Sequence, residues 1–277
     1  MAKHTTFHIG GSADLFVTPK NEDGLKACLR LCREENVTPF FLGNGSNLLV
    51  SDEGIRGIVL YLGENLGEIS VNGNTVTAGA GAKLADVCRA AEKASLAGLA
   101  FAYGIPGSVG GGVFMNAGAY NGELSQVLQS VTVLTKTGEE VTYKANDCGF
   151  SYRHSRFMEE ESVILKATFA LQKGDRDKIT AEMKDILSRR KEKQPLEYPS
   201  AGSVFRRPEG YFAGALIEGA GLKGASVGGA FVSEKHAGFI VNKGAATAAD
   251  VKALIQKIQQ TVLEKDGVEL VCEIRMV

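Results

Sequence analysis

The sequence predicts an α+β fold, and three observations support this class. Alternating apolar segments turn at Asn72-Gly73 and again at Thr137-Gly138, which is a signature of antiparallel hairpins. Helical apolar patterns form separate blocks, with no regular strand–helix–strand series. Glycine is abundant, with 34 residues, and it gathers in a few stretches without a repeating period. Hairpins combined with separate helices favour α+β over a parallel α/β arrangement.

The spacing of apolar residues assigns each element in order. Strands and hairpins, marked by alternation or short apolar runs, are expected at 14–18, 39–42, 57–62, 68–78, 130–144, 163–172, 237–242 and 267–276. Helices, marked by an apolar stripe, are expected at 22–35, 83–95, 175–193, 211–218 and 248–265. Asn21 and the pair Thr247 and Asp250 can cap two of these helices. The glycine-rich stretch 98–122 receives no regular element.

Composition bounds the class of protein. The chain has 277 residues, 44% of them hydrophobic, and domains usually hold roughly 100–200 residues, so two or three compact units are expected. Lys and Arg number 31 and Asp and Glu 32, which leaves no strong positive field for nucleic acid. No apolar run reaches the roughly 18 residues that span a bilayer, and the first residues lack a signal-peptide core. We therefore expect a cytoplasmic protein with neither a nucleic-acid nor a membrane partner.

Two patterns that often carry chemistry have simpler explanations here. Gly219-Ala-Gly221-Leu-Lys-Gly224 matches G-x-G-x-x-G, but a helical pattern precedes it and a strand-like segment follows it, the reverse of a dinucleotide-binding turn. A glycine helix stop followed by a tight turn explains it better. The five cysteines form no Cys-x-x-Cys pair and read as small core residues, so no metal site is expected.

Two glycine-bearing segments are candidates for ligand contact. Gly43-Asn44-Gly45-Ser46-Asn47 directly follows the predicted strand 39–42, and its backbone N–H groups and polar side chains can face a phosphate. Taken alone it is equally well explained as a simple turn. The stretch 104–112 is long, apolar and nearly uncharged, and it packs poorly by itself. Such a segment suits a cradle for a large flat ligand.

These segments together resemble one enzyme family. The sequences GNGSN (43–47), GIPGSVGGGVFMNAGAY (104–120), FSYRHSRF (150–157), KQPLEYPSAGSVFRRPEGYFAG (193–214) and VSEKHAGFIVN (232–242) are similar to those of the shorter form of UDP-N-acetylenolpyruvoylglucosamine reductases. The resemblance covers the whole chain. It implies an FAD-binding fold of the vanillyl-alcohol oxidase/PCMH type, with two α+β subdomains and a third α+β substrate-binding domain. The implied division is 1–55 with 266–277, then 56–172, then 173–265.

The resemblance also implies three catalytic residues, namely Arg153 of the Tyr-Arg-x-Ser motif, Ser203 of the Ala-Gly-Ser motif, and Glu273 near the C-terminus. Their chemistry suits the reduction of an enol ether, in which hydride adds to one alkene carbon and leaves an enolate-like anion. A guanidinium stabilises that charge, a hydroxyl supplies the proton, and a carboxyl group assists the charge redistribution or proton relay. Taken one at a time, Arg153 could belong to a surface ion pair, Ser203 could be a turn residue and Glu273 could be a charge on an edge strand.

Further contacts follow from the same resemblance. Residues expected to hold non-covalent FAD are Gly43, Asn44, Gly45, Ser46, Asn47, Gly104, Pro106, Gly107, Ser108, Gly111, Gly112, Asn116, Ala117 and Gly118. Residues expected to bind the UDP-sugar are Tyr120, Tyr152, Arg190, Lys193, Gln194, Arg207 and Arg275. NADPH is the expected co-substrate, and a monomer is expected. Arg189 and Lys191 are expected to belong to a solvated helix face.

Two other functions remain open at this point. The chain could be a different flavoenzyme of the same fold, such as an alcohol or sugar oxidase, which would consume oxygen with an alcohol substrate. It could also be a non-catalytic protein that binds a flavin or a nucleotide sugar. The presence of Arg153, Ser203 and Glu273 in their motifs argues against that second alternative.

Overall fold

The computed structural model describes all residues, Met1–Val277, and the chain divides into two compact units. Unit 1 consists of Met1–Asp14, Gly45–Arg56 and Lys191–Val277, and unit 2 consists of Leu15–Asn44 and Gly57–Arg190. The division into three functional domains remains a prediction. The fold class is α+β, as the hairpins and separate helices indicated.

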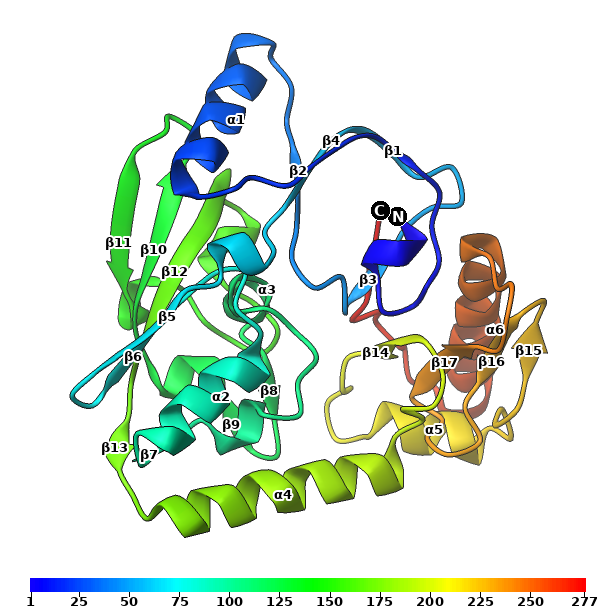
Figure 1. The fold of residues 1–277 in the computed structure, drawn as a ribbon. Coiled ribbons are helices and arrows are strands. Elements are labelled where there is room, and N and C mark those ends of the chain that lie inside the picture. The colour runs from blue at the N-terminus through cyan, green and yellow to red at the C-terminus, as the bar shows by residue number, and fades with distance from the viewer. The chain divides into compact units, whose positions relative to one another are not determined.

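Unit 2 is built on an antiparallel five-stranded sheet with the order β11-β10-β12-β6-β5 (Figure 1). Its strands are β5 (Ile69–Asn72), β6 (Thr75–Gly79), β10 (Leu128–Thr135), β11 (Glu140–Lys144) and β12 (Ser162–Ala170). Helices α2 (Leu84–Lys93) and α3 (Val109–Phe114) pack against this sheet. Val76, Val131 and Phe169 are fully buried in the resulting core.

A smaller sheet of order β1-β4-β2 holds the segment that leads to the first glycine motif. Its strands are β1 (Ala13–Val17), β4 (Ile55–Tyr61) and β2 (Phe40–Leu42), and β2 runs parallel to β4. Helix α1 (Glu22–Glu34) makes the crossover, and it begins where the Asn21 side chain accepts a hydrogen bond from Gly24 N at 2.9 Å. The predicted cap is therefore confirmed.

The remaining elements of unit 2 are short, apart from one long helix. Strand β7 (Leu96–Ala97) pairs with β13 (Gln172–Lys173), and β8 (Gly118–Ala119) pairs with β9 (Gly122–Glu123). Helix α4 (Arg176–Lys193) follows β13, and its residues from Lys191 onward are counted with unit 1. The stretch 98–122 was predicted to be irregular, but it contains α3, β8 and β9. A six-residue helix that carries three consecutive glycines has no apolar stripe that could announce it.

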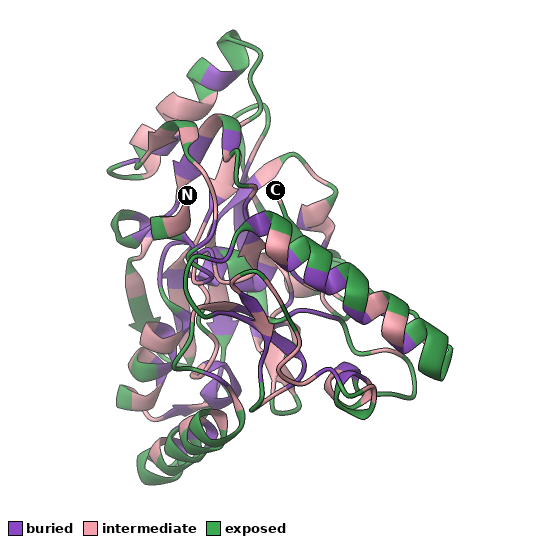
Figure 2. Ribbon diagram, turned by 90° about the vertical axis from the view of Figure 1, so that its right-hand side faces the viewer, coloured by how far each residue is buried: buried purple, intermediate pink, exposed green.

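Unit 1 contains a four-stranded sheet with the order β14-β17-β16-β15. Its strands are β14 (Ser200–Ser203), β15 (Ser226–Val227), β16 (Ala230–Val232) and β17 (Phe239–Asn242). Helices α5 (Ala213–Gly219) and α6 (Ala248–Asp266) contact each other, and α6 covers β15 and β16. Figure 2 shows the buried stripe along α6, and the predicted capping box of Thr247 and Asp250 is present.

The end of unit 1 differs from the sequence prediction, which placed a strand over 267–276. Only β18 (Arg275–Met276) is a strand, and it pairs in parallel with β3 (Leu48–Leu49). Gly267 adopts a left-handed conformation, φ +67°, and ends α6 there. The next residues bond to helix α6 and to a neighbouring segment, because Leu270 O accepts from the Gln259 side chain of α6 and Cys272 forms a single bridge with Phe205.

The cysteines are all free thiols, and four of the five lie in unit 2. Cys88 on α2 is buried, its Sγ donates to Leu99 O at 3.2 Å, and burial raises its pKa to about 12. Burial likewise raises the pKa of Cys148 to about 11. Cys272 of unit 1 is half-buried, and burial raises its pKa as well. Burial therefore keeps the thiols of Cys88, Cys148 and Cys272 protonated near neutral pH.

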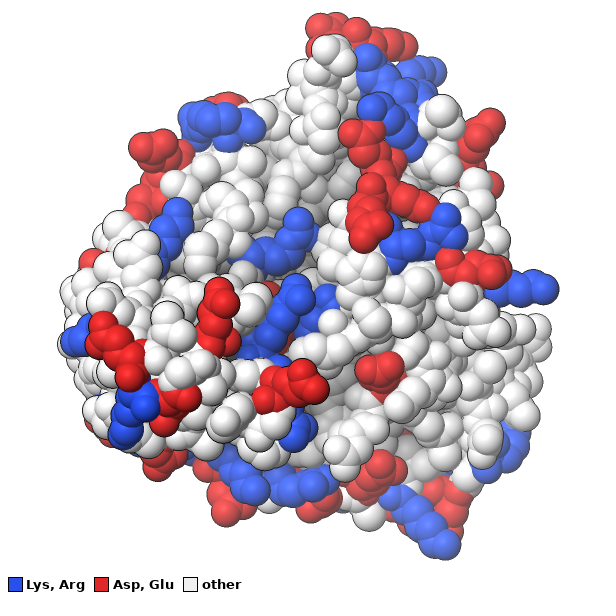
Figure 3. All heavy atoms as spheres, turned by 180° about the vertical axis from the view of Figure 1, so that it is seen from behind, with Lys and Arg blue, Asp and Glu red and all other residues white.

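Charge is spread over the surface in both signs. Figure 3 shows Lys and Arg interspersed with Asp and Glu on one face, in keeping with a net charge of -1. None of the helices combines the length and the apolar character that a bilayer crossing requires.

Candidate functional site

The predicted site residues fall in both units, and each group is described within its own unit. Unit 2 contains Gly43, Asn44, Gly104, Pro106, Gly107, Ser108, Gly111, Gly112, Asn116, Ala117, Gly118, Tyr120, Tyr152, Arg153 and Arg190. Unit 1 contains Gly45, Ser46, Asn47, Lys193, Gln194, Ser203, Arg207, Glu273 and Arg275.

The two glycine segments meet in unit 2. Gly43 follows β2, and a Cβ built on it would lie 2.3 Å from Ser108 Oγ. The Asn44 side-chain amide donates to the carbonyl oxygen of Pro106. Ser108 is buried and caps α3, with its Oγ accepting from Gly111 N at 3.4 Å. The structure therefore brings the start of 43–47 onto the segment 104–112.

The three consecutive glycines of α3 have different surroundings. Gly111 is exposed, and a Cβ there would meet only Ser108 Oγ, at 3.5 Å. Gly112 is buried, and a Cβ there would lie 3.1 Å from both Leu84 and Leu124. The prediction that Gly112 binds a cofactor is therefore corrected, because its open side is filled by the core. Of the three glycines, only Gly111 is exposed, so the outward face of this helical turn carries no side chain at that position.

Gly45 is restrained by the protein itself. Its φ is +60°, and a Cβ would lie 2.2 Å from the carbonyl oxygen of His4, within unit 1. A backbone atom at that distance cannot move aside as a flexible side chain can. The need for glycine at this position therefore arises from backbone packing inside unit 1, whatever the motif binds.

Three segments of unit 1 meet near Asn47, Val204 and Glu273, and this places Ser203 and Glu273 on neighbouring segments. Val204 O accepts from Glu273 N at 2.7 Å and from Ile274 N at 3.4 Å. Asn47 makes two hydrogen bonds to the same segment. Its side chain donates to Glu273 O at 3.2 Å, and its backbone carbonyl accepts from Arg275 N at 3.0 Å. Ser203 is exposed and follows Gly202, whose φ is +79°.

Arg153 occupies a tight turn in unit 2. Ser151 and His154 exchange two backbone hydrogen bonds of 3.2 Å, and Tyr152 and Arg153 form the turn between them. Arg153 has φ +56°, which is unfavourable for a side chain other than glycine or asparagine. Its Nη2 donates to Gly118 O at 3.3 Å, and its guanidinium lies 5.0 Å from the Tyr152 ring centroid. The guanidinium is thus held near β8.

Asn116 has an internal role that the sequence did not indicate. It is fully buried, its Nδ2 donates to Ser151 O at 3.1 Å, and its Oδ1 accepts from Ser125 N at 3.0 Å. Asn116 was predicted to bind the cofactor; this is corrected, because the residue is fully buried and both polar atoms of its side chain are bonded within unit 2. Asparagine tolerates the observed φ of +43° just after a helix end, which suits this residue to the position.

Tyr120 and the end of α4 form a cationic edge on unit 2. Tyr120 has φ +51°, and the Arg189 guanidinium lies 4.7 Å from its ring centroid. Arg189 also pairs with Asp185 at 2.8 Å, so it is more than a solvated charge. Arg190 is half-buried beside Gly104, where a Cβ would lie 3.2 Å from its Cδ, and burial lowers its pKa.

The remaining predicted substrate contacts lie in unit 1. The Arg207 guanidinium stacks 4.0 Å from the Phe212 ring centroid, and its Nε donates to Tyr211 O at 3.4 Å. The Gln194 Oε1 is buried without a hydrogen-bond partner, which is uncommon for a carboxamide oxygen. Lys193 is exposed at the end of α4. These groups can offer positive charge and one unused acceptor to an anionic ligand.

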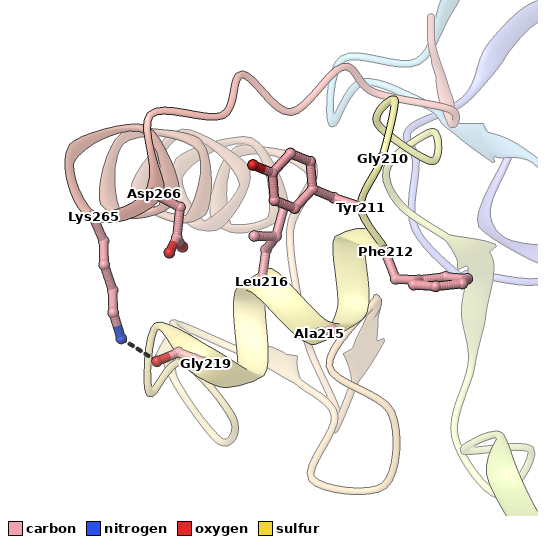
Figure 4. A pocket seen from close by; sticks show the side chains of 8 residues that line it. All are labelled: Gly210, Tyr211, Phe212, Ala215, Leu216, Gly219, Lys265 and Asp266. Carbon is pink, nitrogen blue, oxygen red and sulfur yellow. Dashed lines mark hydrogen bonds between the residues drawn. The ribbon is translucent and has the colours of Figure 1, made fainter.

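A separate pocket of about 300 Å³ lies in unit 1 beside the contact of α5 with α6. Its lining includes Tyr211, Leu216 and Asp266, and Lys265 donates to Gly219 O at its rim (Figure 4). None of the predicted site residues lines it.

Comparisons with known proteins define the class. A family model described as an FAD binding domain matches residues 13–144, and one described as the C-terminal domain of UDP-N-acetylenolpyruvoylglucosamine reductase matches 194–277. The chain is thus an FAD-binding oxidoreductase of the predicted fold class. The curated reductases of that name from Clostridium novyi (strain NT) and Clostridium botulinum (strain Hall) are 53% and 50% identical over 277 residues, spanning 100% of this chain and 90% of each relative.

A solved structure agrees with these relatives. The UDP-N-acetylenolpyruvylglucosamine reductase from Thermus caldophilus superimposes with a TM-score of 0.85 at 35% identity, covering 99% of this chain and 96% of that one. The protein belongs to the UDP-N-acetylenolpyruvoylglucosamine reductase family. The resemblance seen in its motifs is confirmed.

The residues of unit 2 fit an FAD cofactor. The joined segments present an exposed Gly111 with no side chain over α3. Backbone without side chains suits the close approach of a flat ring and of a diphosphate bound by N–H groups.

Proposed function

We propose that this protein catalyses the NADPH-dependent reduction of UDP-N-acetylglucosamine enolpyruvate to UDP-N-acetylmuramate, a step of peptidoglycan precursor synthesis. When bound, FAD supplies the redox chemistry that carries hydride from NADPH to the enolpyruvyl ether. One observation carries the residue assignment. Val204 O binds the backbone of Glu273 and Ile274, so two residues predicted from separate motifs, Ser203 and Glu273, lie on adjoining segments.

Arg153 is the proposed stabiliser of negative charge. Hydride addition to the terminal alkene carbon leaves an enolate-like anion next to the substrate carboxylate, and a fixed guanidinium lowers the energy of that charge. The hydrogen bond to Gly118 O and the stack over Tyr152 limit its motion. A strained, tightly held arginine is expected where preorganised charge is needed.

Ser203 is the proposed proton donor to the remaining alkene carbon. A serine hydroxyl is a weak acid, so it serves only when the acceptor is a strongly basic carbanion and its own anion is stabilised. Glu273 assists that proton transfer, either directly or through a relay. Asn47 holds the backbone of Glu273 on one side and that of Arg275 on the other, which fixes the carboxyl-bearing residue relative to β3.

The anionic substrate requires a complementary set of groups. Arg190, Lys193 and Arg207 are proposed to meet the UDP diphosphate, with charge-assisted hydrogen bonds from the two guanidinium groups. A donor on the substrate would satisfy the buried Oε1 of Gln194. The remaining proposed contacts are Tyr120, Tyr152 and Arg275.

The proposed cofactor contacts comprise the residues of the two glycine segments and their continuation. They are Gly43, Asn44, Gly45, Ser46, Gly104, Pro106, Gly107, Ser108, Gly111, Ala117 and Gly118. Asn47 is proposed as a contact too, through its backbone or its side-chain oxygen, because the bond to Glu273 O uses only Nδ2.

A visible spectrum of the purified protein tests the proposal. The protein should be yellow, NADPH should bleach it without oxygen, and the enolpyruvyl UDP-sugar should restore the colour and yield UDP-N-acetylmuramate by mass spectrometry. Acid precipitation should release all the colour into the supernatant, because the cofactor is non-covalent. Recolouring by oxygen together with turnover of an alcohol, and not by the UDP-sugar, would instead identify an oxidase of the same fold.

A further inference from the structure

The turn that carries Arg153 is fastened to a second segment of unit 2 at three points. Asn116 Nδ2 donates to Ser151 O at 3.1 Å, Arg153 Nη2 donates to Gly118 O at 3.3 Å, and Ser155 Oγ donates to Phe114 O at 2.7 Å. Asn116 and Ser155 are both fully buried. The segment 114–118 therefore acts as the support for the turn 151–154.

Asn116 is the only one of these anchors that ties together three stretches of chain. Its Oδ1 accepts from Ser125 N at 3.0 Å while its Nδ2 holds Ser151, so the carboxamide can neither rotate nor slide without breaking a bond. Its backbone is fixed as well. Asn116 N donates to Val113 O at 3.1 Å and Ala117 N donates to Gly112 O at 2.8 Å, the paired bonds of a Schellman helix end.

The turn needs such support because Arg153 has an unfavourable backbone conformation. A left-handed backbone conformation is unfavourable for a residue with a Cβ. Arg153 has φ +56°, and the surrounding bonds must hold it there. Loss of the bond to Ser151 would allow the turn to relax and the guanidinium to leave its place near Gly118.

We infer that Asn116 is a positioning residue for the reduction of the enolpyruvyl substrate, acting through the Arg153 turn and not by contact with the cofactor. The inference rests on the proposed function of Arg153. It assigns Asn116 to the half-reaction that consumes substrate. The half-reaction in which NADPH reduces the flavin should not depend on it.

Asn116→Ala and Asn116→Asp test this inference in the FAD-loaded enzyme. Both variants keep the backbone bonds of the helix end. The aspartate variant also keeps an acceptor for Ser125 N, and it cannot donate to Ser151 O at a pH high enough to ionise this buried carboxyl group. Stopped-flow absorbance follows the two half-reactions separately. Misplacement of a catalytic group by about 1 Å can cost roughly 10²-fold, so substrate-driven flavin oxidation should slow by about 10- to 100-fold. FAD content and the rate of reduction by NADPH should stay within about twofold of wild type, because no contact to either is lost.

A double-mutant cycle with Arg153→Ala separates positioning from a general structural effect. Arg153→Ala alone should slow the substrate half-reaction, and adding Asn116→Ala to it should change that rate by less than about twofold, since residues that act as one unit are non-additive. Thr132→Val is a matched control, because it removes one buried hydrogen bond of unit 2, to Thr142 at 3.0 Å, away from the turn. It should leave both half-reactions unchanged.

Three results would overturn the inference. Loss of FAD, or slower reduction by NADPH, in Asn116→Asp would mean that Asn116 serves the cofactor directly. Equal losses from Asn116→Ala with and without Arg153 would mean that it acts independently of the turn. An unchanged substrate half-reaction in Arg153→Ala would remove Arg153 from the proposed function, and the inference would fail with it. The first two results leave the proposed function intact.

Discussion

Substitution of the exposed glycine of α3 should separate the stability of unit 2 from its affinity for FAD. Gly111 lies inside a helix, its φ is not positive, and a Cβ would touch only Ser108 Oγ at 3.5 Å, an ordinary contact distance. Gly111→Ala therefore introduces no clash. It also removes the entropic cost of glycine in a helix, roughly 0.5–1 kcal/mol.

The expected magnitude can be checked by calorimetry. A gain of about 0.5–1 kcal/mol corresponds to a rise in Tm of roughly 1–4 °C for a protein of this size class. The apo-protein should show that rise. FAD affinity, measured by fluorescence titration, should fall by at least about tenfold, because the added methyl stands where the flavin needs bare backbone.

Gly112→Ala serves as the matched control on the other side of the same helix. Its Cβ would lie 3.1 Å from Leu84 and Leu124, so these buried side chains must shift. Overpacking typically costs about 1–3 kcal/mol, which exceeds the roughly 0.5–1 kcal/mol that alanine gains over glycine in a helix. The apo-protein of this variant should melt earlier. If Gly111→Ala binds FAD as tightly as wild type, the outward face of α3 is not against the cofactor, and the reasoning from bare backbone is wrong.

Three further predictions concern single residues. Gly45→Val should lower the Tm of the apo-protein and not only its FAD content, because its Cβ would lie 2.2 Å from His4 O at φ +60°; an unchanged apo Tm would contradict this. Ser203→Ala should leave flavin reduction by NADPH near wild type. It should slow substrate-driven flavin oxidation by at least about 10²-fold, the range of a positioned general acid, as measured by stopped-flow absorbance. A loss within about tenfold would instead make Glu273 or a water molecule the proton donor. Arg207→Ala should raise KM for the UDP-sugar more than it lowers kcat, because a diphosphate keeps its charge throughout the reaction; steady-state kinetics with a pure kcat defect would refute this.

The sequence predicted those elements whose signals are local. The side chain of Asn21, the capping box at Thr247, and the turns near Gly73 and Gly138 each depend on residues within a few positions, and all are present. The hairpin 68–78 turns at Gly73 and Asn74, one residue later than predicted. The pattern for 267–276 failed because Leu270 and Ile274 are buried in the core of unit 1 without a strand ladder, and burial alone gives the alternation of a strand.

The candidate site was predicted only in part for a related reason. The motifs identified Arg153, Ser203 and Glu273, but the residues that hold them make long-range hydrogen bonds that no spacing rule reveals. The resemblance assigned Asn47 and Asn116 to the cofactor, and it gave no sign of their internal bonds. In the structure their carboxamides also donate to Glu273 O and Ser151 O. These bonds join positions that lie far apart in the sequence, so they depend on the tertiary fold and not on local sequence.

Because the thiols are divided between the two units, their labelling rates can measure local opening in each unit without added probes. Four cysteines lie in unit 2 and only Cys272 lies in unit 1, where it neighbours Glu273. A protected thiol reacts with an alkylating reagent only when its surroundings open, so the rate of labelling measures the free energy of that opening. Peptide mass mapping of the labelled thiols would then show which unit opens first. Cys272 is half-buried, so its labelling rate would report the accessibility of the terminal segment, whereas modification of the buried Cys88 would report disruption of the core around α2.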